Sequence, residues 1–225
     1  MSSELGSTSV LGDCETYNLK GSTIPLEKVL RIQGYRDLSA VRKDVRQIAT
    51  TMTARATNLS APIAIFRKVS IESCDQDSLR LGTGTSFNYS GFEPLLRNCD
   101  HVIPFILTLG GKIDEESLQL QEKGDIVEAL FLETAGWIGI EQASRELAIY
   151  LQKKLKKDGL CLTRRFGPGY NEWNLLEQKS LFELFSDTDF PVELLESCAM
   201  LPKKSRSGLY GVRPLSSPRS SLIKN

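Results

Sequence analysis

The spacing of apolar residues predicts several helices along the chain. In residues 38–55, apolar side chains recur every three or four positions, as one face of a helix requires, at Val41, Val45, Ile48 and Met52. A short helix is predicted before it, starting at Pro25 and ending at Gly34, because proline suits the first helical position. Further helices are predicted at Phe92–Cys99 and Leu175–Phe185, with one helical turn at Pro191–Leu194.

Shorter segments predict strands. Ala61–Val69 contains a β-prone run, and Val102–Leu109 has the composition of a buried strand. Strands are also predicted at Ser78–Gly82, Glu196–Leu201 and Ser205–Val212. This mixture of elements, without an internal repeat or a long linker, predicts a single α+β domain over residues 21–213. Residues 1–20 and 214–225 are rich in small and polar residues and are predicted to be a flexible leader and a flexible tail.

The longest predicted element is a helix from Asp125 to about Lys157, which Gly159 ends. Its apolar stripe is predicted to consist of Leu130, Trp137, Ala148, Leu151 and Leu155. Thr134 and Glu141 interrupt this stripe at its own spacing. A carboxylate on a core-facing stripe is unfavourable unless it is paired or faces a ligand, so Glu141 is a candidate functional residue.

The same helix has a separate face of small residues, formed by Gly136, Gly139 and Ala143. Each glycine lowers helix propensity by roughly 1 kcal/mol, so their presence indicates the close approach of another element. Simple tight packing is the preferred explanation for this face.

Composition narrows the classes of function. Lys and Arg number 28 and balance 28 Asp and Glu, so the basic excess of a nucleic-acid-binding protein is missing. The apolar runs are too short to span a bilayer and no secretory signal pattern is evident, so we expect a cytoplasmic protein without a membrane partner. Five scattered cysteines predict free thiols, and the single histidine, His101, is assigned a structural role, so no metal site is expected.

Residues Arg164–Trp173 have the composition of a ligand-binding loop. They read Arg-Arg-Phe-Gly-Pro-Gly-Tyr-Asn-Glu-Trp. Glycine and proline fix an irregular backbone whose N–H groups stay available. Arginine suits a carboxylate or a phosphate, and an aromatic face can hold a cation or a flat base. A surface turn between two helices is the simpler interpretation of this loop when it is taken alone.

Two segments together resemble a known family. Arg165–Tyr170 resembles the R-x-x-P-G-Y loop of the activation domain of cobalamin-dependent methionine synthase. Glu196–Pro202 and Ser205–Tyr210 resemble that domain's E-S-x-A-M-x-P-x-x-S-x-S-G-x-Y segment, in the same order and at a similar distance. Residues 125–212 account for most of the likeness, which is closer to stand-alone proteins of about this length. The resemblance implies a mainly antiparallel sheet packed against helices.

The resemblance also implies a cofactor site. In that family the loop holds S-adenosylmethionine beside the cobalt of a corrinoid on another domain. Matching positions imply cofactor contacts from Arg165, Gly167, Pro168, Gly169, Tyr170 and Tyr210. Glu133 and Glu141 are candidates for the acidic contacts of the family's long helix. This chain continues with Asn171–Trp173, where the synthase domain has Pro-Ala-Cys.

The function that the resemblance implies is reductive reactivation of an oxidised corrinoid in methionine biosynthesis. The methyl group would come from S-adenosylmethionine, and the electron from a flavodoxin-like or other low-potential donor. Because the sequence has no D-x-H-x-x-G corrinoid motif, the cobalamin (vitamin B12) is expected on a partner, a corrinoid-binding methyltransferase or methionine synthase subunit. An alternative is a non-catalytic docking module for a corrinoid protein. An unrelated methyltransferase is disfavoured because no strand–G-x-G–helix unit occurs.

Overall fold

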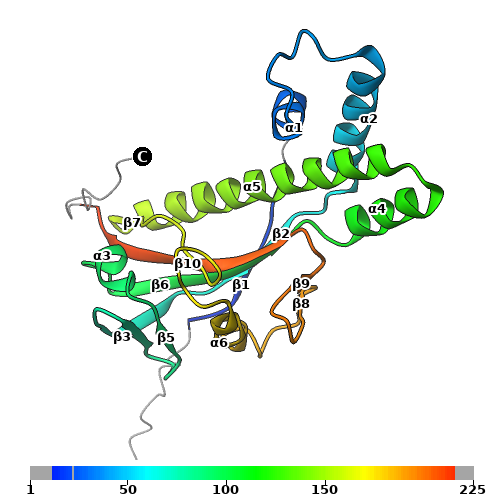
Figure 1. Cartoon of the computed structure of the whole chain (residues 1–225). Helices are drawn as coiled ribbons and strands as arrows, with labels where there is room; N and C mark the ends of the chain where they lie inside the picture. Colours follow the sequence, from blue (N-terminus) through cyan, green and yellow to red (C-terminus); the bar gives the residue numbers. More distant parts are fainter. Residues whose placement is uncertain (1–11, 22, 216–225) are drawn as a thin grey trace, which may run out of the picture.

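An antiparallel sheet forms the centre of the fold (Figure 1). The computed structural model describes residues 12–21 and 23–215. Its central strand β6 (His101–Thr108) pairs with β10 (Ser205–Pro214) on one side and with β2 (Ile63–Phe66) on the other. The remaining strands of this sheet are β1 (Glu15–Asn18), β3 (Val69–Cys74), β4 (Ser78–Leu81), β5 (Ser86–Asn88) and β7 (Leu160–Leu162). A separate hairpin pairs β8 (Glu193–Leu194) with β9 (Met200–Leu201).

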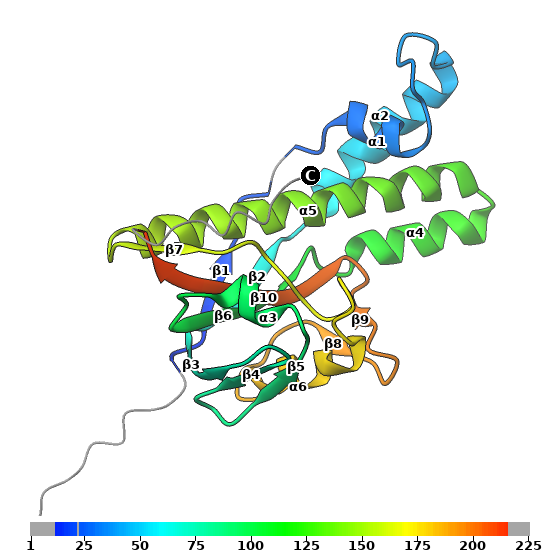
Figure 2. The same ribbon diagram turned by 60° about the vertical axis from the view of Figure 1, so that its left-hand side comes forward.

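Helices cover both faces of the sheet. They are α1 (Leu26–Ile32), α2 (Lys43–Leu59), α3 (Phe92–Leu96), α4 (Lys112–Lys123), α5 (Ile126–Lys156) and α6 (Gln178–Glu183), the last preceded by a 3-10 turn at Leu175–Glu177. The long α5 crosses one face, where α1, α2 and α4 pack against it (Figure 1). The opposite face is covered by α6 and the β8–β9 hairpin, as Figure 2 shows from a second direction.

Successive side chains of the central strands point to opposite faces of the sheet, which divides the apolar core into two parts. Phe105 and Leu107 of β6 belong to the core beneath α5, whereas Ile106 belongs to the core on the opposite face. The same alternation in β10 places Tyr210 beneath α5 and Leu209 on the other side. Successive side chains of a strand point to opposite faces, so every second residue of β10 is directed toward α5.

The predicted fold class is confirmed: the structure is an α+β fold with an antiparallel sheet packed against helices. The long predicted helix is α5, and the predicted buried strand is β6. All the strand pairs in the described residues are antiparallel. No helix within the described ranges is long and apolar enough to cross a membrane.

Several predicted boundaries are wrong. Glu15–Asn18 pairs with β2 as strand β1, so the sheet begins inside the predicted leader of residues 1–20. At the other end β10 extends to Pro214, and residues 1–11 and 216–225 lie outside the described residues. The helical turn predicted at Pro191–Leu194 is absent, because backbone pairing with β9 makes Glu193–Leu194 a strand. The helix predicted over residues 38–55 begins at Lys43 and ends at Leu59.

The predicted apolar stripe of the long helix is also partly wrong. Leu130 and Trp137 are 52% and 54% exposed, whereas Thr134 is buried and hydrogen-bonds to the Gln33 side chain. The buried face of α5 is set by its contacts with the sheet, α2 and α4. It includes the small-residue face, where a Cβ at Gly139 would lie 3.0 Å from Leu109 Cδ1.

Candidate functional site

The loop that follows β7 is hydrogen-bonded to β10, so the two segments singled out in the sequence form one unit. The Phe166 N–H donates to the Leu209 carbonyl at 3.1 Å, and the Leu209 N–H donates to the Phe166 carbonyl at 2.8 Å. A Cβ at Gly167 would lie 3.1 Å from the Ser207 carbonyl oxygen and 3.2 Å from Gly208 Cα. Glycine at position 167 therefore allows the loop backbone to lie directly against β10.

Trp173 anchors the end of the loop in the core. Its side chain is buried, and its ring packs against Phe87, Tyr89, Phe92 and Phe166. The indole N–H donates to Glu177 Oε2 at 2.6 Å, and the Glu177 carboxylate also accepts from the Asn88 N–H at 2.9 Å. Gly169, with φ of +83°, turns the chain so that its N–H donates to the Trp173 carbonyl at 2.8 Å. The departure from the family pattern at Asn171–Trp173 thus fixes the loop on β5.

Arg165 and Tyr170 contact each other in the loop. The guanidinium carbon of Arg165 lies 5.5 Å from the centroid of the Tyr170 ring, within cation–π range. Tyr170 is half-exposed and Arg165 is partly buried, whereas Arg164 is exposed and Pro168 is buried. An accessible guanidinium beside an aromatic face suits a ligand that combines a carboxylate with a flat ring.

Arg206 and Glu141 join β10 to α5. Arg206 Nη1 donates to Glu141 Oε2 at 2.6 Å and to Ser144 Oγ at 3.1 Å. The Arg206 side chain is only 10% exposed, whereas the Glu141 side chain is 44% exposed, so the ion pair is shielded from water on the arginine side alone. The hydrogen bond from Arg206 holds the pKa of Glu141 below its usual range, and the charge of Arg165 acts in the same direction. Glu141 is therefore ionised at neutral pH and already paired.

Tyr210 lies beneath the same helix, close to both arginines. Its ring stacks on Phe105 with the centroids 5.1 Å apart. Burial raises the pKa of Tyr210 to about 12, although the positive charges of Arg165 and Arg206 act to lower it. The phenol is therefore neutral at physiological pH and can donate a hydrogen bond.

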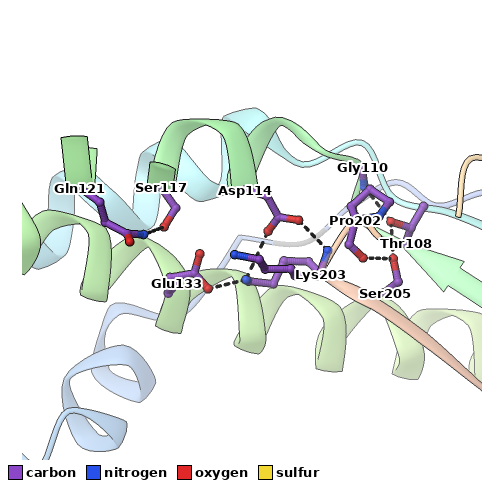
Figure 3. Close-up of polar contacts among 10 residues, drawn as sticks. Thr108, Gly110, Asp114, Ser117, Gln121, Glu133, Pro202, Lys203 and Ser205 are labelled. Carbon is purple, nitrogen blue, oxygen red and sulfur yellow. Dashed lines mark hydrogen bonds and ion pairs between the residues drawn. The ribbon is translucent and has the colours of Figure 1, made fainter. Parts of the chain in front are cut away.

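A second ion cluster lies just before Arg206 in the chain. The buried Lys204 places Nζ 2.6 Å from Glu133 Oε2 and 3.5 Å from Asp114 Oδ1. Figure 3 shows Asp114 also accepting a hydrogen bond from the Lys203 N–H, at 2.5 Å. Burial acts to raise the pKa of Glu133, but the hydrogen bonds from Lys204 and Ser117 and the charges of Lys204 and Lys203 together outweigh it, and the pKa is lowered. Glu133 is thus a partner of a buried lysine rather than a free carboxylate.

This cluster fixes the corner that leads into β10. The Ser205 hydroxyl lies 2.6 Å from the Pro202 carbonyl oxygen and 2.9 Å from the Thr108 hydroxyl (Figure 3). A Cβ at Gly136 would lie only 2.7 Å from Lys204 Cε, so glycine makes room for the lysine under α5. The corner therefore determines where the following residues of β10 meet α5.

A cavity of about 170 Å³ lies elsewhere along α5, next to the segment before α1. Its lining includes Lys20, Thr57, Leu109 and Gly139 and none of the predicted site residues. The candidate site is therefore an accessible surface rather than this cavity. All five cysteines are free thiols, and the described residues hold no cluster of three or more Cys, His, Asp or Glu side chains suited to a metal ion.

The charge of Arg165 acts on both Glu141 and Tyr210, so these residues share one region, and Arg165 lies over the Tyr170 ring. Gly167, Pro168 and Gly169 shape the loop backbone, and the binding role of all seven predicted residues stays a prediction. Sequence reasoning missed Arg206. Arg206 and Tyr210 are four residues apart in a predicted strand, so their side chains lie on the same face of the sheet. This spacing could have identified Arg206 as a neighbour of the site.

Comparisons with known proteins support the fold. No family model matches the chain, and no curated protein matches it. Among solved structures, the chain is similar to the MetH reactivation domain bound to AdoHcy, with a TM-score of 0.58 and 14% sequence identity. The alignment covers 95% of this chain and 84% of that chain. The chain therefore has the fold of that reactivation domain, as the resemblance predicted.

Proposed function

We propose that the protein binds S-adenosylmethionine and presents its methyl group to the cobalt of a corrinoid on a partner protein, which is thereby reductively reactivated. The observation that supports this proposal most is that the two motif segments, Arg165–Tyr170 and Ser205–Tyr210, lie against each other in the fold. The loop from Arg165 to Tyr170 is hydrogen-bonded to β10, and Arg165 lies close to Tyr210 and Glu141. The reactivation domain that shares the fold was solved with AdoHcy, the demethylated form of the proposed cofactor.

The chemistry of the site suits that cofactor. S-adenosylmethionine has a carboxylate, an ammonium, a sulfonium and a purine. Arg165 can bind the carboxylate through charge-assisted hydrogen bonds, and the Tyr170 face can attract a sulfonium. The neutral Tyr210 phenol can donate to an acceptor on the ligand. These groups come from a loop and a strand joined by backbone hydrogen bonds, so the site is organised before the ligand arrives.

The task of the protein in this proposal is positioning. Holding a methyl group in line with an acceptor lowers the barrier through proximity and orientation and needs no nucleophile from the protein. The corrinoid of the partner would supply the cobalt that takes the methyl group after a flavodoxin-like or other low-potential donor has supplied an electron, and AdoHcy would leave. The partner is a corrinoid-binding methyltransferase or methionine synthase subunit, and Arg165, Tyr170 and Tyr210 orient the cofactor toward it.

Calorimetric titration with S-adenosylmethionine and AdoHcy tests the binding step. Arg165→Ala should weaken binding by about 1.5–3 kcal/mol, because a charged hydrogen bond to the carboxylate is lost. Arg164→Ala is the matched control, since Arg164 is the exposed neighbour and its removal should leave the affinity unchanged. Absence of binding by the unmodified protein would contradict the proposal. Equal affinities of Arg165→Ala and the unmodified protein would show that the loop does not hold the carboxylate.

One observation favours the alternative of a non-catalytic docking module. Glu141 is already paired with Arg206 and lies 3.7 Å from Arg145, so a ligand ammonium or sulfonium would have to share its carboxylate with these arginines. Incubating the protein with a corrinoid protein, a low-potential reductant and S-adenosylmethionine separates the two functions. Cobalt methylation seen in the visible spectrum supports reactivation, whereas a stable complex without methylation supports docking alone.

A further inference from the structure

An exposed tryptophan lies near the middle of the rigid helix α5. Trp137 is 54% exposed, whereas Trp173, the other tryptophan of the chain, is 2% exposed. Burial of a large aromatic side chain is strongly favourable, so an indole left half-open to water is a candidate for contact with a ligand or a partner.

Helical spacing places Trp137 between the two ion pairs described above. Glu133 and Glu141 lie one helical turn before and after it, so the three side chains share one stripe of α5. Glu133 pairs with Lys204, and Glu141 pairs with Arg206. Because Lys204 and Arg206 are two residues apart and face α5, the indole stands over the start of β10, one turn of α5 away from the Glu141–Arg206 pair of the candidate site.

The indole has a fixed neighbour on its inner side. Lys204 Nζ lies 5.8 Å from the centroid of the Trp137 ring, and Lys204 is itself buried and held by Glu133. The cation therefore helps to orient the ring, while much of its surface remains open. A flat base with polar edges suits an indole flanked by charged groups better than an apolar protein surface does.

We propose that Trp137 stacks on the adenine ring of the bound cofactor and thereby sets the preference of the site for a purine. This inference rests on the proposed function. Arg165 and Tyr170 would hold the amino-acid end of the ligand, and Trp137 would hold the other end. An aromatic ring on a helix that is already packed loses little freedom on binding, which favours this use of it.

Calorimetry with AdoHcy on three variants tests the stacking. Trp137→Leu keeps an apolar side chain over Lys204 but removes the aromatic face, and should raise the Kd about tenfold or more. Trp137→Phe should lie between Trp137→Leu and the unmodified protein. Leu130→Ala is the matched control, because Leu130 lies on the same stripe and is 52% exposed, and it should leave the Kd within about twofold.

Fluorescence gives an independent readout. Stacking of adenine should quench the emission of Trp137, whereas in Trp137→Phe, where only the buried Trp173 emits, most of this quenching should be lost. If the unmodified protein binds AdoHcy and Trp137→Leu binds it equally well, the stacking is refuted while the proposed function stands. An equal loss in Leu130→Ala also refutes the stacking. If the unmodified protein shows neither heat nor quenching, the proposed function falls and this inference falls with it.

Discussion

Replacing Lys204 by methionine tests the ion cluster beside the candidate site. The Lys204 side chain is 1% exposed, and its ammonium contacts Glu133 and Asp114, whose side chains are 27% and 16% exposed. Without this ammonium, two partly shielded carboxylates remain near each other and lose their ion-pair partner, with only the more distant charge of Lys203 left to act on Glu133. Breaking a buried pair in this way costs about 3–5 kcal/mol. Because water reaches part of Glu133, we expect the lower end, about 3 kcal/mol of unfolding free energy.

The loss should depend on pH in a defined direction. In the unmodified protein the pKa of Glu133 is lowered, so the stability from the pair is present above the unfolded value of about 4.3 and is lost as the pH falls through the folded value. In Lys204→Met the two contributions of Lys204 are lost, and burial, the largest single influence, then raises the pKa of Glu133 against the smaller effects of Ser117 and Lys203. Protonation of Glu133 then removes the unpaired charge from the variant. The loss of unfolding free energy in Lys204→Met is therefore greatest near neutral pH and shrinks on acidification.

Urea unfolding at about pH 7 and about pH 5 measures both effects. Arg97→Met is the control, because Arg97 and Glu93 form an ion pair at 3.2 Å with both side chains more than half exposed. That variant should lose less than about 1 kcal/mol. The reasoning is refuted if Lys204→Met unfolds within about 1 kcal/mol of the unmodified protein at neutral pH, or if its deficit is the same at both pH values.

Two further predictions concern the loop anchor and the buried phenol. Trp173→Ala should lower the unfolding free energy, measured in urea, by about 3–5 kcal/mol, because a packed ring and the hydrogen bond to Glu177 are lost. If Trp173→Ala loses less unfolding free energy than Trp137→Leu does, Trp173 does not anchor the loop. The raised pKa of Tyr210 favours the folded state below the unfolded value of about 10, and that stability is lost as the pH rises toward about 12. The unmodified protein should therefore lose stability relative to Tyr210→Phe above about pH 10, and parallel pH profiles would contradict the assignment.

The local pattern of apolar residues predicted correctly the elements that are buried along their whole length. The apolar run of β6 is buried almost throughout, so composition alone indicated a strand. The long α5 has its periodicity interrupted by contacts on several sides, and reading one stripe assigned Leu130 and Trp137 to the core. Which face of a helix is buried depends on the neighbours that tertiary packing supplies, and these are absent from a local pattern.

Only part of the candidate site was predictable, because a local pattern shows contiguous motifs but not the contacts between residues that are distant in the sequence. The loop glycines and Arg165 belong to a short contiguous motif, whereas the partnership of Arg206 with Glu141 joins residues 65 positions apart. Strand β8 was missed because two residues have no period to detect, and only pairing with β9 defines them. Trp173 was noted as a departure from a motif, but its role as an anchor depends on β5 and Glu177.

The pairing of β6 with β10 has a consequence for the order of folding. Thr108 and Ser205 are joined although 97 residues separate them, and β10 provides one half of the candidate site. Contacts between distant residues form slowly, because the entropy of closing a long loop must be overcome first. We therefore expect the candidate site to assemble late in folding. A partly folded chain that has formed α5 but not the β6–β10 pair would not bind a ligand through both the loop and β10.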